Sequence, residues 1–115
     1  MVATNRGLPD NPLDFIQQCL RAQKVYWTYH VNMRLAGRHI SRDEILGAVN
    51  SYSIVEAYPD DKYLPSYLLL ATPTAKAFHV LFAVHVEGDN IRVITAYHPS
   101  PEEWEPDLRT RRAKP

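Results

Sequence analysis

Residues 77–86 read AFHVLFAVHV, and this stretch decides the fold class. Every second residue, starting with Phe78, is a large apolar one, which is the period of a strand with one face against a core. His79 and His85 share the opposite face of that strand, because successive side chains of a strand point to opposite sides. The stretch is too short, and too interrupted by histidine, to cross a membrane.

Similar alternation is found on both sides of this stretch. The sequence therefore predicts four strands, over 52–58, 66–72, 77–87 and 90–98. The segments between them, YPDDKYLP, TPTA and EGDN, are rich in turn residues, and EGDN is short enough to join two antiparallel strands.

Upstream of residue 52 the apolar period is helical. A helix is predicted over 12–24, with Asn11 as its cap and Pro12 in its first turn. After VYWT (25–28), which could be a short extended piece, a second helix runs over 29–36, and Gly37 is expected to end it in a left-handed turn. Ser41 and Glu44 form a capping box for a third helix that ends near residue 50.

Helices followed by consecutive strands predict an α+β fold. Two or three N-terminal helices are expected to pack on a curved antiparallel sheet of about four strands. A short C-terminal helical turn is expected around Trp104, where Ser100 and Pro101 resemble a helix start. We expect a single domain over 11–109, a flexible lead-in over 1–10 and a basic tail over 110–115.

The composition is that of an ordinary globular domain, with 115 residues, 45% hydrophobic and 23% charged. Thirteen Lys and Arg balance thirteen Asp and Glu, which argues against a strongly basic nucleic-acid coat protein and against an acidic disordered tail. Cys19 is the single cysteine, so no disulfide can form within the chain. The first twenty residues lack a secretory signal, and a cytoplasmic protein without membrane segments is expected.

His30, Arg34 and Arg38 are the first candidate site residues. His30 and Arg34 are four apart on a predicted helix and share one side of it, and Arg38 can fold back toward them. Such a cluster suits an RNA phosphate, because arginine supplies fixed charge and histidine titrates near neutral pH. In the alternative, His30 packs between helices while Arg34 pairs with a carboxylate such as Asp43 or Glu44.

His79 and Tyr97 are the second candidate pair. His79 is expected to face Tyr97 or Thr95 on the neighbouring strand, and either His79 or Tyr97 could serve as acid or base. The alternative is a half-buried histidine whose ring is hydrogen-bonded to a backbone carbonyl. His79 and His85 are about 20 Å apart along the strand, too far to share a metal ion.

Trp104 and Arg109 complete the candidates, as nucleic-acid-binding residues. The Trp104 ring could stack on a nucleobase, although it could equally close the end of the core. Arg109 begins a run with Arg111 and Arg112 that could contact phosphate or remain a solvated tail. No phosphate loop, dinucleotide fingerprint or zinc spacing is present, so neither a metal nor a cofactor is expected.

The chain as a whole resembles a known family. The segments that carry the resemblance are TYHVNMRLAGRHISRDEILGAV, IVEAYPDD, SYLLLA, FHVLFAVHV and ITAYHPSPEEW, which together span about 25–109. Their order is similar to that of the small bacterial family known as domain of unknown function 4258. This chain differs from the family pattern at Tyr29, which is large, and at Val31, where a small residue is usual.

The layout of this family looks like that of RelE-type and BrnT-type toxin ribonucleases, a likeness of architecture alone. It implies a metal-independent endoribonuclease of toxin type, with RNA as substrate and a protein such as an antitoxin as partner. The alternative is a non-catalytic protein-interaction module. The oligomeric state is left open.

Overall fold

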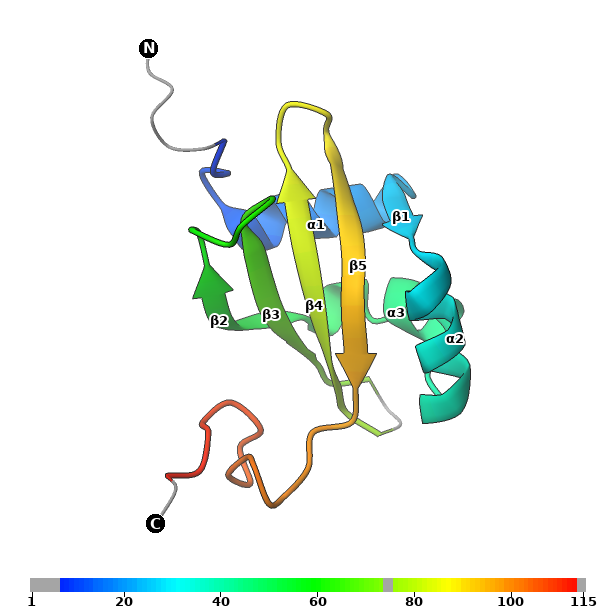
Figure 1. The fold of residues 1–115 in the computed structure, drawn as a ribbon, viewed down its shortest axis with the longest axis vertical. Coiled ribbons are helices and arrows are strands. Elements are labelled where there is room, and N and C mark those ends of the chain that lie inside the picture. The colour runs from blue at the N-terminus through cyan, green and yellow to red at the C-terminus, as the bar shows by residue number, and fades with distance from the viewer. Residues whose placement is uncertain (1–6, 74–75, 114–115) are drawn as a thin grey trace.

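The computed structural model of the chain describes residues 7–73 and 76–113. Helices come first and strands dominate the second half, which confirms the α+β fold (Figure 1). In chain order the elements of the described part are α1 (Pro12–Arg21), β1 (Val25–Trp27), α2 (Tyr29–Arg38), α3 (Arg42–Gly47), a 3-10 turn η1 (Val49–Ser51), β2 (Ser53–Tyr58), β3 (Ser66–Ala71), β4 (Phe78–His85) and β5 (Asn90–Tyr97). Among these residues, no helix combines the length and the apolar content needed to cross a membrane.

The strands form one sheet in the order β1-β5-β4-β3-β2. The four predicted strands pair antiparallel in sequence order, as expected. The VYW piece adds a fifth strand, which pairs parallel to β5 with Val25 opposite Ile91. Because β1 leads directly into α2, this helix continues along the same edge of β5 (Figure 1).

The end of α2 differs from the prediction. Gly37 does not end the helix: it lies within α2, and His39 takes the left-handed conformation instead, at φ 57° and ψ 39°. The Ile40 amide then donates to the carbonyl of Leu35 at 3.2 Å, closing the helix end, and the Ile40 side chain is 2% exposed. Burial of Ile40 therefore fixes His39 as the residue at which the helix ends and the chain reverses. His39 adopts a positive φ there although it is not glycine.

The core lies on the helix side of the sheet. Phe78, Val80, Phe82 and Val84 of β4 are fully buried there against the helices, as the alternation predicted. No helix of the described residues covers the opposite side, and we call it the open face. Its side chains include Glu56, Tyr58, Leu68, His79, Leu81, Ala83, Arg92, Thr95 and Tyr97.

A bulge in β5 changes which residues reach the open face. Leu81 pairs with Thr95, but the next residue of β4, Phe82, pairs with Val93, so Ile94 is an extra residue. Val93 and Ala96 are both buried in the core, and Ile94 and Thr95 between them both face the open side. Bulges commonly re-aim side chains next to functional sites.

The C-terminal segment, residues 99–113, folds back over the end of the sheet. A single turn forms first, in which the amides of Glu103 and Trp104 donate to the Ser100 carbonyl at 3.0 and 2.9 Å. The chain then crosses from the end of β5 toward β2 (Figure 1). Contacts continue past residue 109, because the Arg112 amide donates to the Glu103 carbonyl. The expected lead-in over 1–10 falls mostly outside the described residues.

Candidate functional site

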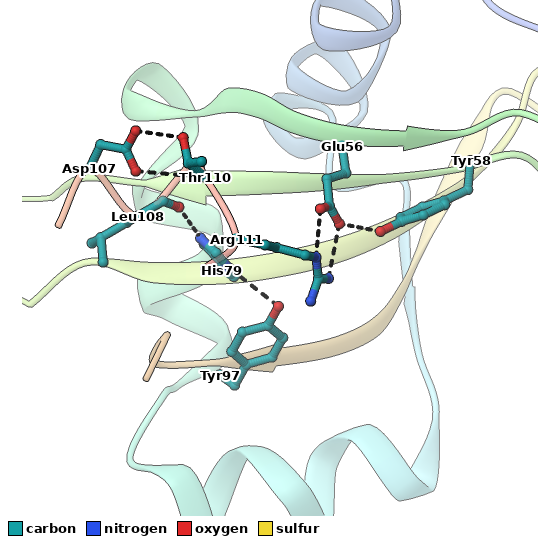
Figure 2. A network of polar contacts seen from close by, with 8 residues as sticks. All are labelled: Glu56, Tyr58, His79, Tyr97, Asp107, Leu108, Thr110 and Arg111. Carbon is teal, nitrogen blue, oxygen red and sulfur yellow. Dashed lines mark hydrogen bonds and ion pairs between the residues drawn. The ribbon is translucent and has the colours of Figure 1, made fainter. Parts of the chain in front are cut away.

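His79 and Tyr97 lie opposite each other on β4 and β5, so Tyr97, and not Thr95, is the neighbour of the two that the sequence left open for His79. The Nδ1 atom of His79 is 3.2 Å from the Tyr97 hydroxyl, and its Nε2 atom is 2.7 Å from the carbonyl oxygen of Leu108 (Figure 2). The contacts of both hypotheses are present at once, since His79 contacts a tyrosine and also a backbone carbonyl, while its role as acid or base stays a prediction. His79 is fully buried rather than half-buried.

These two contacts fix the protonation of the His79 ring. A carbonyl oxygen can only accept, so Nε2 carries the hydrogen and donates to Leu108. Burial lowers the pKa of His79, and the bond to Leu108 opposes that shift only in part, so the ring is neutral near pH 7. Nδ1 is therefore free to accept, and the Tyr97 hydroxyl donates to it.

Trp104 of the C-terminal segment packs against the His79 ring. The two rings meet edge to face, with centroids 4.5 Å apart and planes at 86°. Trp104 is 1% exposed, so its ring is not presented to a nucleobase. This is the arrangement of the alternative hypothesis, in which Trp104 closes the end of the core.

The Tyr97 side chain lines a pocket, and His79 is not among the residues that line it. The pocket lies over the open face and has a volume of about 290 Å³. It is lined by Tyr58, Asp61, Leu68, Leu81, Thr95, Tyr97 and Arg111. Burial raises the pKa of Tyr97, although the positive charge of Arg111 opposes this shift. Tyr97 is thus a neutral hydroxyl, hydrogen-bonded to a neutral base and facing a ligand-sized space.

Tyr58 and Arg111 also line the pocket, and the Glu56 carboxylate links them. The Arg111 guanidinium donates twice to the Glu56 carboxylate, at 2.7 and 3.0 Å, and the Tyr58 hydroxyl donates to the same carboxylate (Figure 2). The hydrogen bonds from Arg111 keep the pKa of Glu56 below its usual value. The Arg111 guanidinium and the Glu56 carboxylate that it binds are therefore both charged near pH 7.

Arg38 of α2 contacts a residue that lines this pocket. One Nη1 atom donates to the Thr95 hydroxyl at 3.0 Å and to the Ala96 carbonyl at 2.7 Å, and Thr95 lines the pocket. Within residues 7–73 and 76–113, no carboxylate forms an ion pair with Arg38. The half-buried Arg38 thus places a cation without an acidic counter-ion at the border of the pocket.

His30 and Arg34 lie farther from this group on the chain. Both are exposed, and they precede Arg38 by two turns and one turn of α2, so the three residues follow one side of the helix. In the described part of the chain Arg34 forms no ion pair, and so not with Asp43 or Glu44. The structure brings His79, Tyr97 and Arg38 together, whereas the roles of His30 and Arg34 stay predictions.

Arg109 is attached to the fold. Its guanidinium donates to the Ser53 hydroxyl and to the Ile54 carbonyl, so it fastens the C-terminal segment to β2. A contact between Arg109 and nucleic acid stays a prediction.

Three members of the site were missed in the sequence. Glu56 and Tyr58 lie in the IVEAYPDD segment that carries the family resemblance, and they share one face of β2. Arg111 stood in a run of basic residues that gave no sign of its partner. Among the described residues, no group of three or more His, Cys, Asp or Glu side chains is placed to hold a metal ion.

Comparison with known proteins places this arrangement in a family. The family model described as Domain of unknown function (DUF4258) matches residues 27–98, from the end of β1 to just past β5. That range contains Glu56, Tyr58, His79 and Tyr97 but not the C-terminal segment. No curated protein and no solved structure matches the chain. The chain belongs to the family with the description Domain of unknown function (DUF4258).

Proposed function

We propose that this protein is a metal-independent endoribonuclease whose active site is the pocket at Tyr97. The observation that carries the proposal is the Tyr97–His79–Leu108 chain of hydrogen bonds, which ends at a pocket lined by Arg111 and by Thr95, the hydrogen-bond partner of Arg38. A buried base that orients a hydroxyl toward a cavity is a common feature of acid–base catalysis.

The reaction is the attack of a ribose 2′-oxygen on the adjacent phosphorus, which breaks the bond from phosphorus to the 5′-oxygen. Tyr97 accepts the 2′-hydroxyl proton as its own proton moves to Nδ1 of His79. The Leu108 carbonyl then faces an imidazolium and stabilises its charge. The same proton returns through Tyr97 to the leaving 5′-oxygen. The products are a 2′,3′-cyclic phosphate and a 5′-hydroxyl, and the pair is restored.

Charge at the pocket supports this role for the arginines. Negative charge builds up on the phosphate oxygens in the transition state, and fixed guanidinium groups stabilise it. Arg38 is the better placed of the two, because Arg111 is already paired with Glu56. Its guanidinium also has N–H donors on Nε and Nη2, beyond the Nη1 group that binds Thr95 and Ala96.

The test is cleavage of a mixed RNA pool by the pure protein in EDTA. Tyr97→Phe removes only the hydroxyl, and we expect it to lower the rate at least about 100-fold, the usual contribution of a general acid–base group. Arg38→Gln is expected to lower the rate comparably. Arg34→Ala tests whether the side of α2 that leads to Arg38 takes part.

Tyr29→Phe is the matched control, because it removes the hydroxyl of a tyrosine that is 75% exposed on α2. Melting curves of all variants separate lost catalysis from lost folding. Equal rates for Tyr97→Phe and the wild type, or no cleavage by concentrated wild-type protein, would contradict the proposal.

A second candidate function is that of a non-catalytic protein-interaction module. The observation in its favour is a pair of exposed apolar side chains one turn apart on α2, Tyr29 at 75% and Met33 at 60%. A protein partner such as an antitoxin would cover them. Loss of partner binding in Met33→Ser, without any RNA cleavage by the wild type, would favour this function.

A further inference from the structure

A second pocket lies beside the first on the open face. It has a volume of about 370 Å³ and is lined chiefly by Thr28, Tyr63, Leu64, Ala83, Arg92 and Ile94. Ile94 and Thr95 are consecutive residues of the β5 bulge, and they face the second and the first pocket respectively. Asp61 borders both pockets. The two pockets are therefore neighbours on the open face, and we call them together the trough.

Exposed aromatic rings paired with cations flank the second pocket. Tyr63 is 83% exposed, and the Lys62 ammonium lies 5.3 Å from its ring centroid. Tyr26 on β1 is 60% exposed, and the Arg92 guanidinium lies 5.9 Å from its ring centroid. In the part of the chain that the structure describes, neither Lys62 nor Arg92 forms an ion pair.

We infer that this trough holds two successive nucleotides of single-stranded RNA, with the second pocket as the subsite next to the point of cleavage. The inference rests on the proposed function, because it takes the pocket at Tyr97 as the site of reaction. Open aromatic faces accept any nucleobase, and neighbouring cations neutralise phosphates, a combination typical of single-strand binding sites.

We expect the aromatic side chains of the trough to favour a single strand. Each pocket can take the flat face of one unstacked base, whereas a duplex keeps its bases paired and stacked. Duplex RNA would offer only its backbone to the sheet. Asp61 is the acidic group at the junction of the pockets, where its carboxylate accepts from the Ser66 hydroxyl at 2.6 Å.

Binding is measured with a fluorescent six-residue 2′-O-methyl RNA, which lacks the free 2′-hydroxyl and so cannot be cleaved. Tyr63→Ala is expected to raise Kd about tenfold, the loss of one base–aromatic stack. Tyr63→Phe keeps the ring and should leave Kd within twofold of the wild type. The same sequence as a duplex should bind at least about tenfold more weakly than the single strand.

A matched pair of charge variants tests the phosphate contact. Arg92→Gln should weaken binding and flatten its dependence on salt, because one phosphate contact is lost. Arg21→Gln removes a cation of the same kind from α1 on the helix side, and it should change neither. Equal Kd values for Tyr63→Ala and Tyr63→Phe, equal binding of duplex and single strand, or no binding by the wild type would overturn the inference.

The two proposals fail in different ways. If RNA is cleaved but Kd is insensitive to Tyr63 and Arg92, the two-nucleotide trough is wrong and the active site stands. If Kd depends on both residues but RNA is not cleaved, the trough stands as a binding site and the endoribonuclease proposal is wrong.

Discussion

His79 shows how one residue can join the core to the candidate site. It lies on the open face of β4, yet Trp104 and the carbonyl of Leu108 bury it completely. Burial therefore keeps its ring neutral, while its two hydrogen bonds fix which nitrogen carries the proton. A neutral ring with Nδ1 as the acceptor is the form that can take a proton from Tyr97.

The lowered pKa of His79 predicts a pH dependence of stability. The unfolded chain protonates this ring below pH 6.5, whereas the folded protein resists protonation until a lower pH. The unfolded state thus binds more protons in that window, and stability falls as pH falls below about 6.5, by at most about 1.4 kcal/mol per pH unit. Urea titrations between pH 5 and 8 measure this slope.

His79→Gln is the control for this slope, because an amide can replace both hydrogen bonds but does not titrate. The variant should lose the His79 contribution below pH 6.5, whereas His30→Gln, at an exposed position, should retain it. Identical slopes for the wild type and His79→Gln would show that His79 is not the source.

At the scale of elements, α2 ends at a different residue from the one that its local sequence predicts. Gly37 has the conformational freedom that a helix end favours, but the chain continues as helix to Arg38 and reverses at His39. Burial of Ile40 outweighs the strain of positive φ at His39, which is of the order of 1 kcal/mol. Gly37 is left in a helical conformation that other residues adopt more readily.

Gly37→Ala is therefore expected to stabilise the protein by about 0.5–1 kcal/mol, because alanine loses less backbone entropy in a helix. A Cβ at this position would meet nothing within 4 Å, so no clash opposes the gain. Chemical denaturation measures the change in the free energy of unfolding.

Gly88→Ala is the opposite case, since its Cβ would come within 2.5 Å of Nδ1 of His85. That variant should be destabilised. A loss of stability in Gly37→Ala would mean that the helix end does not extend past residue 37.

At the scale of the whole molecule, the C-terminal segment completes both the core and the site. It supplies the Leu108 carbonyl to His79, the Arg111 guanidinium to Glu56 and the Trp104 ring that covers His79. This segment lies beyond the residues that the family model matches. His79 and Tyr97 thus lie within the matched range, whereas Trp104 and Leu108, which bury His79, lie outside it.

Trp104→Ala is expected to destabilise the protein by about 3–5 kcal/mol, because it removes a fully buried ring from contact with His79 and Arg111. Chemical denaturation measures the change, and Tyr63→Ala, at a side chain that is 83% exposed, should change stability little. A cost below about 1 kcal/mol for Trp104→Ala would show that the segment is not held against the sheet.

The sequence by itself determined the element types and the central pair of the site. Alternation of apolar residues is a local property, so β2 to β5 and the face that carries His79 could be predicted from it. Capping residues likewise marked the starts of α1 and α3, because a cap acts within one turn.

Only the tertiary structure decided which distant groups meet. Glu56 and Arg111 are 55 residues apart, and Arg38 is 57 residues from Thr95, so no local period relates them. The β5 bulge also shifts the alternation by one residue, which places Thr95 and Arg92 on the same face although they are three apart. Sheet order and register arise from packing of the whole chain, and they assemble the pocket around Tyr97.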